Sequence, residues 1–431
     1  LQSLLSGLCP RQPESARPRT PQSPTMLLLG YAAVRRALPP SGLPLLSELG
    51  DEGFVLGSLS AGAGGPAYVL SGGEGAARGT LYAVYEWLHQ LGVRFYAWDE
   101  THFPPCPAEL GGDGAALPAL PLQQHSAPLE YRYMPVAPSS PTMDEHHMWL
   151  LRSRFNVVED EDWYAPPNGS WWTAEHGGGW TNAIGFPEAT SYTIFGPGPR
   201  NGSGPPLKYY NQNREWFWPN NNSAVDGQLC FSNASLVSFL TERVRSILTK
   251  QPNATLFSLS VLDNKLFCQT PAELAVIAAE GGSPMGPLMR ALNSIGAALE
   301  PDFPHVTLVT LAYLSFTPPP KTAPRHNVAV RVCSVSCDFG RPLSDPTNSC
   351  DGFKAEVDSW VALGKQNGGR IWVWNYEADD EDFLMPWPDY RTVGQNVAWY
   401  AEHGVRGVYE ETSYMSPGGD FAPLKSYIIA R

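Results

Sequence analysis

Residues 370–379 are RIWVWNYEAD, residues 395–404 are QNVAWYAEHG, and residues 404–414 are GVRGVYEETSY. The first and last segments are short apolar runs with aromatic and β-branched residues, which predicts two buried strands. The middle segment is predicted as a helix. A strand, a helix and a second strand in this order predict a βαβ unit with parallel strands.

The same alternation extends toward the N-terminus. Further strands are predicted at residues 129–136, 156–158, 255–264, 305–316 and 327–335. Further helices are predicted at residues 144–155, 235–250, 287–299 and 353–365. A long polar and aromatic insertion is expected at residues 163–222. Because the number of strands comes close to eight, we predict a (β/α)8 TIM-type barrel over residues 128–431. No short internal repeat is visible, which disfavours a solenoid.

The first part of the chain has its own α/β pattern. Short apolar strands are predicted at residues 25–30, 53–59 and 66–72, followed by a helix that ends near Gly92. The glycine-rich residues 71–79 lack the Lys-Ser/Thr ending of a phosphate loop, so a structural turn is favoured. The predicted fold class is α/β, with an N-terminal α/β sandwich domain ahead of the barrel. The predicted divisions are a disordered leader at 1–25, the N-terminal α/β domain at 26–105, a linker at 106–127 and the barrel at 128–431.

Composition excludes several classes of protein. The chain has 431 residues and a net charge of -13, and no long Lys/Arg run offsets that charge. Nucleic acid is therefore not expected as a partner, because phosphate binding needs a basic surface. No apolar run reaches transmembrane length. The last residues, 421–431, break off inside a predicted helix, so we expect the gene product to continue.

Glycosylation motifs indicate the compartment. Five N-x-S/T acceptor sites are predicted, at Asn168, Asn201, Asn221, Asn233 and Asn253. Their density favours a secreted or extracellular glycoprotein. The chain has seven cysteines, so an odd thiol stays free or pairs outside this sequence, and the pairing is left open. No Cys/His spacing resembles a zinc site, and no metal or other cofactor is predicted.

Carboxylates stand at the predicted carboxyl ends of three strands. In a barrel of this kind catalytic groups lie at those ends, which selects Asp263, Glu377, Glu410 and Glu411. A single such acid is often only a helix N-cap, but three strand ends with acids together favour chemistry. Glu410 and Glu411 are adjacent, so strand alternation turns only one of them toward the barrel axis.

Paired carboxylates suit cleavage of a glycosidic bond. One group protonates the leaving oxygen and a second supports the developing oxocarbenium ion as base or nucleophile. In a third mechanism the substrate's 2-acetamido group attacks, and Asp263 with Asn264 would orient it. Abundant Trp and Tyr, 14 and 18 residues, supply either large cores or flat platforms for sugar rings.

Long and unusual strings carry a family resemblance. The segment SGGEGAARGTLYAVYEWLHQLGVRFYAWDETHFP resembles the α/β domain that precedes the barrel in bacterial α-glucuronidases. WLLRSRFNV, FSLSVLDNKLFC, IWVWNYEADDEDFLMPWPD and AEHGVRGVYEETSYMSPGGDFAPLKSYI resemble the catalytic domain of glycoside hydrolase family 163. Together these segments span most of residues 26–431.

The resemblance implies an endo-β-N-acetylglucosaminidase with a retaining mechanism, acting on complex N-glycans or other GlcNAc-containing glycans of a glycoprotein. It implies an essential role for one of Glu410 and Glu411, with Asp263 as partner. The sugar subsites would be lined by Asn264, His176, Trp374, Tyr376, Trp387 and Tyr414. Family members carry several cysteines after the Asp-Asn pair, whereas only Cys268 follows closely here, so the substrate is less firmly implied than the reaction class.

Two other functions stay open. An exo-acting hexosaminidase or uronidase would have a closed subsite instead of an open cleft. A catalytically inactive glycan-binding or matrix protein, with extracellular assembly partners, would keep the barrel without turnover. A protease or phosphatase is poorly supported, because no GxSxG, HExxH or metal-ligand cluster occurs.

Overall fold

The structure is a computed structural model, and it describes most of the chain from Met26 onward. The described residues are 26–37, 46–60, 66–105, 120–135, 143–160, 180–184, 194, 207–220, 223–252, 254–335, 337–413 and 419–431. The predicted leader at 1–25 lies outside them.

An eight-stranded sheet forms the centre of the molecule. Its strands, in spatial order, are β7 (Tyr131–Tyr133), β16 (Gly407–Glu411), β15 (Arg370–Tyr376), β14 (Val328–Cys333), β13 (Thr307–Ala312), β12 (Leu256–Ser258), β9 (Trp180–Ile184) and β8 (Val157–Asp160). Every neighbouring pair is parallel. The carboxyl ends of all eight strands therefore lie at one edge of the sheet, as predicted.

The sheet is curled. Its two outermost strands, β7 and β8, approach each other, and the Asn156 N–H donates a hydrogen bond of 3.1 Å to the Arg132 carbonyl. In return, the Asn156 side-chain oxygen accepts from the Arg132 N–H at 2.8 Å. The chain therefore has a mixed α/β fold built on a curled parallel half-barrel sheet.

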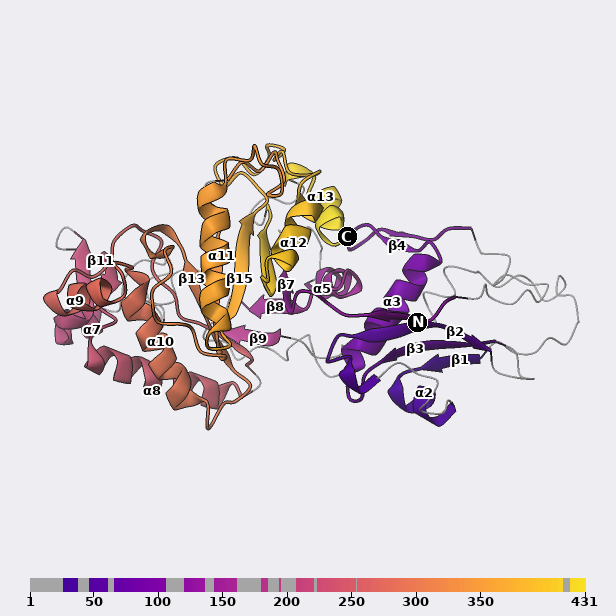
Figure 1. Ribbon diagram of the computed structural model, residues 1–431, viewed down its shortest axis with the longest axis horizontal. Coiled ribbons are helices and arrows are strands. Elements are labelled where there is room, and N and C mark those ends of the chain that lie inside the picture. The colour runs from indigo at the N-terminus through magenta and orange to yellow at the C-terminus, as the bar shows by residue number, and fades with distance from the viewer. Residues whose placement is uncertain are drawn as a thin grey trace, which may run out of the picture.

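The helices α8 (Ala234–Lys250), α10 (Met285–Leu299), α11 (Asp351–Lys365) and α12 (Val393–Glu402) cover the outer face of this sheet (Figure 1). The other helices of this part of the chain are α5 (Met143–Arg152), α7 (Leu207–Gln212), α9 (Pro271–Ala279) and α13 (Ala422–Ile429). A two-stranded antiparallel hairpin, β10 (Phe217–Asn220) and β11 (Ser223–Leu229), precedes α8. The hairpin, α7 and α9 were not predicted from the sequence.

Helix α8 shows why these segments are helical. Its N-cap Asn233 accepts hydrogen bonds from the Ser235 and Leu236 N–H groups, at 3.0 and 3.2 Å. Its buried apolar residues recur every fourth position and form one stripe: Leu236, Leu240, Val244 and Leu248. The cap satisfies the first N–H groups, and the stripe buries the helix against the sheet.

The inner and outer faces of the curled sheet have different cores. The inner core is largely aromatic and includes Tyr131, Tyr133, Trp372, Trp374 and Tyr409. The outer core, between sheet and helices, is mainly aliphatic. Arg331 of β14 lies inside as well, and its guanidinium donates a bond of 2.6 Å to the Tyr131 hydroxyl.

The N-terminal unit has a separate mixed sheet. Its order is β1 (Met26–Leu29), β3 (Pro66–Gly72), β2 (Phe54–Ser60) and β6 (Gln123–His125). The helices here are α2 (Tyr31–Ala37), the short 3-10 helix η3 (Leu46–Glu48) and α3 (Ala77–Gln90), and a small hairpin of β4 (Arg94–Phe95) and β5 (Thr101–His102) follows. Residues 123–125, placed in the linker by the sequence prediction, are thus part of this sheet.

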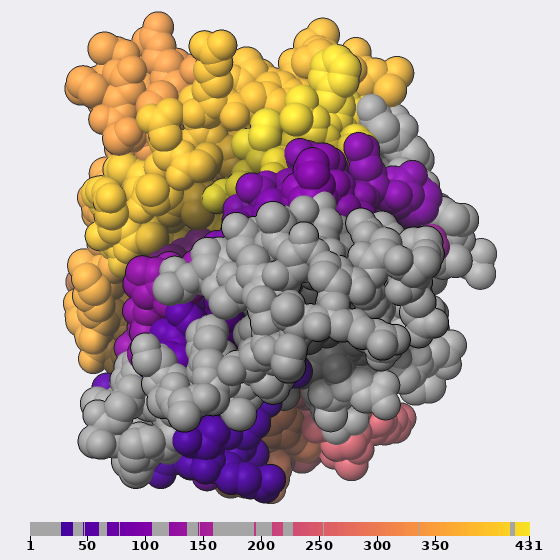
Figure 2. Space-filling model, turned by 90° about the vertical axis from the view of Figure 1, so that its right-hand side faces the viewer, coloured from indigo at the N-terminus to yellow at the C-terminus, as the bar shows by residue number. Residues whose placement is uncertain are grey.

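One hydrophobic core joins the N-terminal unit to the central sheet. It combines residues of α3, such as Tyr82 and Leu88, with Trp149 and Leu150 of α5. The C-terminal helix completes it: Ile429 packs against this core, and the Tyr427 ring lies 4.9 Å from that of Tyr96. Figure 2 shows the yellow C-terminal end against the violet residues of the N-terminal unit.

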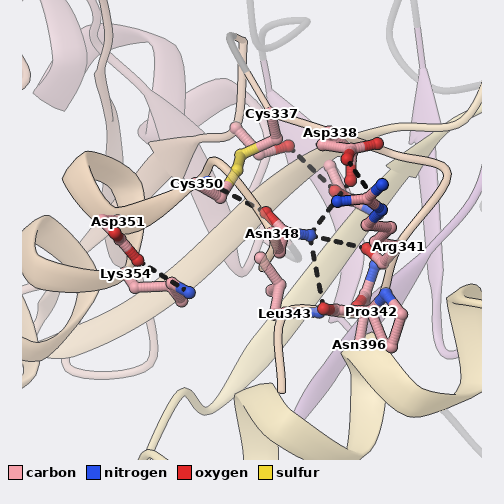
Figure 3. Close-up of a disulfide and its surroundings, with 12 residues drawn as sticks. Cys337, Asp338, Arg341, Pro342, Leu343, Asn348, Cys350, Asp351, Lys354 and Asn396 are labelled. Carbon is pink, nitrogen blue, oxygen red and sulfur yellow. Dashed lines mark hydrogen bonds and ion pairs between the residues drawn. A yellow bond between two sulfur atoms is a disulfide. The ribbon is translucent and has the colours of Figure 1, made fainter. Parts of the chain in front are cut away.

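Two disulfides lie within the described residues. Cys230 is bonded to Cys268, and Cys337 to Cys350, whereas the buried Cys333 is in neither disulfide. The second disulfide closes the loop after β14, where Asn348 donates to the carbonyls of Asp338 and Arg341 (Figure 3). This loop is therefore fixed at the carboxyl edge of the sheet. No helix in the described part of the chain is long and apolar enough to span a membrane.

Candidate active site

The two adjacent carboxylates at the end of β16 face opposite sides of the sheet. Glu411 shares the inner side with Tyr409, and its Oε2 accepts a hydrogen bond of 2.6 Å from the Trp374 indole N–H. Glu410 shares the outer side with Val408, which belongs to the outer core. Strand alternation therefore separates the pair, as the sequence predicted, and selects Glu411 as the inward-facing acid.

Aromatic rings surround Glu411 at the carboxyl edge. The Trp374 ring lies 4.1 Å from that of Tyr409 and 6.3 Å from that of Tyr376. Tyr133 of β7 follows, 5.2 Å from Tyr409. Trp374 and Tyr409 are buried, while Tyr376 is half-buried. The carboxylate thus lies beside a set of flat apolar surfaces, one of which reaches solvent.

The hydroxyl of Tyr376 stays protonated. Burial, and the nearby Cys333 and Glu411, raise the pKa of Tyr376 well above its ordinary value. A phenol in this state donates a hydrogen bond at all ordinary pH values. Tyr376, predicted to bind substrate, therefore has both a ring face and a donor near Glu411.

Glu377 and Glu410 lie together on the outer side of the sheet. The Asn375 side chain accepts hydrogen bonds from Ser334, at 2.8 Å, and Tyr400, at 3.1 Å. Its amide N–H₂ therefore points at the two carboxyls, donating to Glu377 Oε1 and, at 3.0 Å, to Glu410 Oε2. Both glutamates are about 1% exposed. They face away from the inner face that holds Glu411.

A buried lysine binds next to Glu377 and Glu410, and together with Asn375, Asp389 and Asp420 these residues form an outer cluster. Lys425 of α13 is paired with Asp389, at 2.7 Å, and with Asp420, and it donates to the Glu377 carbonyl. Burial, and then the Asp389 and Glu410 carboxyls, raise the pKa of Glu377 well above its ordinary value. Burial also raises the pKa of Glu410, to about 7. The cluster ties the last helix to the ends of β15 and β16.

Asp263 and Asn264 follow β12, and only Asp263 is exposed. The Asn264 side-chain oxygen accepts from Gln228 at 3.0 Å and from the Leu266 N–H at 2.9 Å. Its amide group is therefore engaged in shaping the turn. The Asp263 side chain lies in solvent at the carboxyl edge of the sheet.

Trp387 lies in the loop after β15. It is half-buried, its ring lies 5.3 Å from that of Phe339, and its backbone N–H donates to the Asp420 side chain at 2.7 Å. Because Phe339 belongs to the disulfide-closed loop after β14, the two loops form a joined rim at this edge. Trp387 is thus a rim residue and is not packed on Trp374 in any described contact.

Several predicted residues lie outside the described part of the chain. They are His176, Tyr414 and the acceptor sites Asn168, Asn201, Asn221 and Asn253. Asn233, the remaining acceptor site, is half-buried at the start of α8. Among the described residues no group of His, Cys, Asp and Glu could hold a metal ion.

Sequence reasoning missed most of the outer cluster. Asn375, Asp389, Asp420 and Lys425 are polar residues that become informative only when loops and helix are folded onto the strand ends. The sequence VYEE at residues 408–411 gave part of the answer, because strand alternation puts Tyr409 and Glu411 on the same side of the sheet. It could not say which side, because both faces of a strand in this fold are buried.

Comparisons with known proteins add the following. A family described as "Domain of unknown function (DUF4838)" matches residues 201–431. No curated protein matches the sequence.

Three solved structures show the degree of structural similarity. A β-N-acetylhexosaminidase from Bacteroides fragilis NCTC 9343 has 12% identity and a TM-score of 0.45, covering 89% of this chain and 77% of its own. Endo-glycoceramidase II from Rhodococcus sp., in a cellobiose-like imidazole complex, has 15% identity and a TM-score of 0.32, covering 67% and 66%. CpGH84B has 12% identity and a TM-score of 0.37, covering 89% and 58%. At these values the similarity does not bear on the reaction.

Proposed function

The chain belongs to the DUF4838 family, whose description states no function, and we therefore propose one from the site: a glycoside hydrolase with Glu411 as a catalytic carboxylate. The observation that carries this proposal is the placement of Glu411. It is a buried acid on the inner face of a curled parallel sheet, at the carboxyl edge, and it is bonded to Trp374. Catalytic groups of such folds lie at that edge.

The surroundings of Glu411 suit a sugar. A pyranose presents apolar C–H faces that pack on aromatic rings, and its hydroxyls need hydrogen-bonding groups at the ring edges. Tyr376 offers both, next to the carboxylate. The indole N–H fixes the orientation of the Glu411 carboxylate, which is what a positioned acid, base or nucleophile requires.

A second acidic group is required, and Asp263 is the proposed partner. It is exposed at the same edge of the sheet, so it is accessible to a substrate without any rearrangement. Glu377 and Glu410 are unsuitable because they lie on the outer face. If the 2-acetamido group of the substrate is the nucleophile, Asp263 orients it, since the Asn264 amide is already bonded to Gln228 and Leu266.

The finer proposal follows the resemblance to glycoside hydrolase family 163. It is a retaining endo-β-N-acetylglucosaminidase, acting on N-glycan-type or other GlcNAc-containing glycans, with the sheet closed as a (β/α)8 barrel. The mutual hydrogen bonds of Asn156 and Arg132 between β7 and β8 support closure. Secretion is proposed with it, because two disulfides form within the described residues and disulfides persist in oxidising compartments.

Hydrolysis of a defined complex N-glycan, with mass analysis of the products, tests the proposal. We expect the wild type to release a glycan that ends in one GlcNAc. Glu411→Gln should lower the rate by about 10³-fold or more, because removal of a positioned acid or base costs on the order of 10²–10⁴. Asp263→Asn should lower it by a similar factor. Glu410→Gln is the matched control, with an expected loss below about tenfold.

Two other outcomes would contradict parts of this proposal. If Glu410→Gln abolishes turnover while Glu411→Gln does not, the assignment of the inward acid is wrong. Release of terminal monosaccharides would identify an exo-acting hexosaminidase or uronidase.

One observation favours a second candidate function, a glycan-binding protein without turnover. Two of the four predicted acids, Glu377 and Glu410, lie on the outer face, so fewer carboxylates are available for chemistry than the sequence predicted. Binding of the intact glycan by well-folded wild type, with no product, would establish this candidate and refute the hydrolase.

A further inference from the structure

A surface groove lies between α8, α9 and α10, which pack side by side at one end of the molecule (Figure 1). It has a volume of about 450 Å³, within the range of about 300–1,000 Å³ that is typical of ligand sites. None of the residues that line it belongs to the candidate active site or to the outer cluster around Glu377. The groove is therefore separate from the proposed chemistry.

The lining of the groove combines apolar side chains with hydroxyl groups. All three helices supply apolar residues, namely Val237 of α8, Val276 of α9, and Pro287 and Ala291 of α10. The hydroxyl groups come from Ser232, Ser238, Thr241 and Ser294, of which Ser238 and Ser294 are exposed. This mixture suits a ligand that has both apolar and polar faces.

The charge of the groove is already neutralised. Arg290 is the charged residue among those that line it, and its guanidinium is paired with Glu280 at 2.6 Å. Glu280 in turn accepts from the backbone N–H groups of Lys321 and Thr322, at 2.9 and 2.8 Å. The groove therefore favours an uncharged ligand, and a sugar, with apolar C–H faces and hydroxyls at its edges, has these properties.

An N-glycan acceptor site lies at one end of the groove. The motif is Asn233-Ala234-Ser235, and both neighbours of Asn233, Ser232 and Ala234, line the groove. The Asn233 Oδ1 accepts from the Ser235 N–H at 3.0 Å, the Ser235 hydroxyl at 2.8 Å and the Leu236 N–H at 3.2 Å. Its Nδ2, the atom that carries an N-glycan, makes no hydrogen bond with a described residue and is not buried. A glycan on Nδ2 is therefore compatible with the α8 cap.

We propose that the groove binds the first sugars of this protein's own N-glycan, attached to Asn233. The residues of α8 that line the groove extend from Ala234 to Thr241, about two turns or about 10 Å, so the groove continues along the helix from the attachment point. Because the glycan is tethered, its effective concentration at the groove is about millimolar, and weak contacts are enough to fill it. The inference rests on the proposed secretion and not on the hydrolase activity.

Hydrogen exchange of the backbone amides tests the proposal. The glycosylated wild type, made in a secreting host, is compared with Asn233→Asp, which loses the glycan and keeps the cap. Mass spectrometry measures the occupancy of Asn233. We expect the amides of α8 and α10 beside the groove to exchange at least about threefold more slowly with the glycan, since contacts with the sugars oppose local opening.

A pair of matched variants locates the sugars. Ser238→Trp fills the groove, whereas Ser246→Trp makes the same change at an exposed position of α8 that does not line it. Both serines are exposed, so neither change disturbs the core. In Ser238→Trp the exchange rates with and without the glycan should become equal, and in Ser246→Trp their difference should remain.

Several results would overturn the proposal. If Asn233 carries no glycan while other acceptor sites of the secreted protein do, this inference is wrong and the proposed secretion stands. If no acceptor site carries a glycan, both are wrong. Equal exchange with and without the glycan, or a difference that survives Ser238→Trp, would place the sugars outside the groove. Slow exchange that persists in Asn233→Asp and increases with protein concentration would identify a second copy of the chain as the occupant.

Discussion

Glu52 is the charged residue on which the junction between the N-terminal unit and the central sheet depends. Its carboxylate is paired with Arg78 at 2.8 Å and with Arg132 at 2.7 Å, and Asn156 donates to it at 2.9 Å. Burial alone would raise the pKa of Glu52, but Arg132, Arg78 and Asn156 outweigh it and hold that pKa below its ordinary value. Glu52→Gln removes this charge and keeps the shape.

The expected loss of stability follows from burial. The Arg78 and Arg132 side chains are 9% and 16% exposed, so both guanidinium groups would lose a partner with little water to replace it. Removing one member of a buried ion pair costs about 3–5 kcal/mol. Because glutamine retains an acceptor oxygen, we expect the lower end, about 3 kcal/mol of unfolding free energy.

Urea unfolding at pH 7 measures this loss. The control is Glu242→Gln: Glu242 is 70% exposed and pairs with Arg245 at 3.6 Å, so its loss should cost below about 0.5 kcal/mol. Because the folded pKa of Glu52 is lowered, its contribution is present above the unfolded pKa, near 4.3, and fades as pH falls below it. Exchange of the Asn156 amide proton should also accelerate, since that residue bonds Glu52 and Arg132 together. A loss under about 1 kcal/mol, or equal to that of the control, would refute the reasoning.

Three further outcomes are expected. Replacing Cys230 and Cys268 by serine opens a loop with a sequence separation of 38 residues. In the loop-entropy relation this lowers stability by about 4 kcal/mol, measurable by urea unfolding. Burial raises the folded pKa of Glu410 to about 7, so stability should fall by on the order of 1 kcal/mol per pH unit between the unfolded pKa and pH 7, and Glu410→Gln should flatten that slope. Asn233→Asp should keep the α8 cap, because aspartate caps as well as asparagine, while mass spectrometry of protein from a secreting host shows the loss of one glycan.

Much of the central architecture could be predicted from the sequence. The parallel strands β12–β16 were found because each is a short apolar run between helices, and burial on both faces leaves that pattern. The strands β9 and β10 were missed, since they lie in a polar, aromatic insertion without periodicity, and β11, which directly follows that insertion, was missed as well. The strand β6 was missed because its residues, QQH, show no apolar pattern and form a strand only by pairing with β2.

The candidate site was predictable as a set of strand ends, but not in its orientation. Sequence placed Glu377, Glu410 and Glu411 at one edge, whereas the structure divides them between two faces. The division depends on Asn375, whose orientation is set by Ser334 and Tyr400 from other elements. Contacts of this kind join residues far apart in the chain, so no local pattern reports them.

The core shared by α3, α5 and α13 has a consequence for how the chain divides. A cut between residues 105 and 120 separates two sequence segments, but the two fragments would still hold each other through this core, the β2–β6 pairing and the Glu52 ion pairs. We therefore expect the N-terminal unit and the curled sheet to unfold as one cooperative unit, although the sequence predicts two domains. Mutations that weaken either part are expected to lower the stability of both.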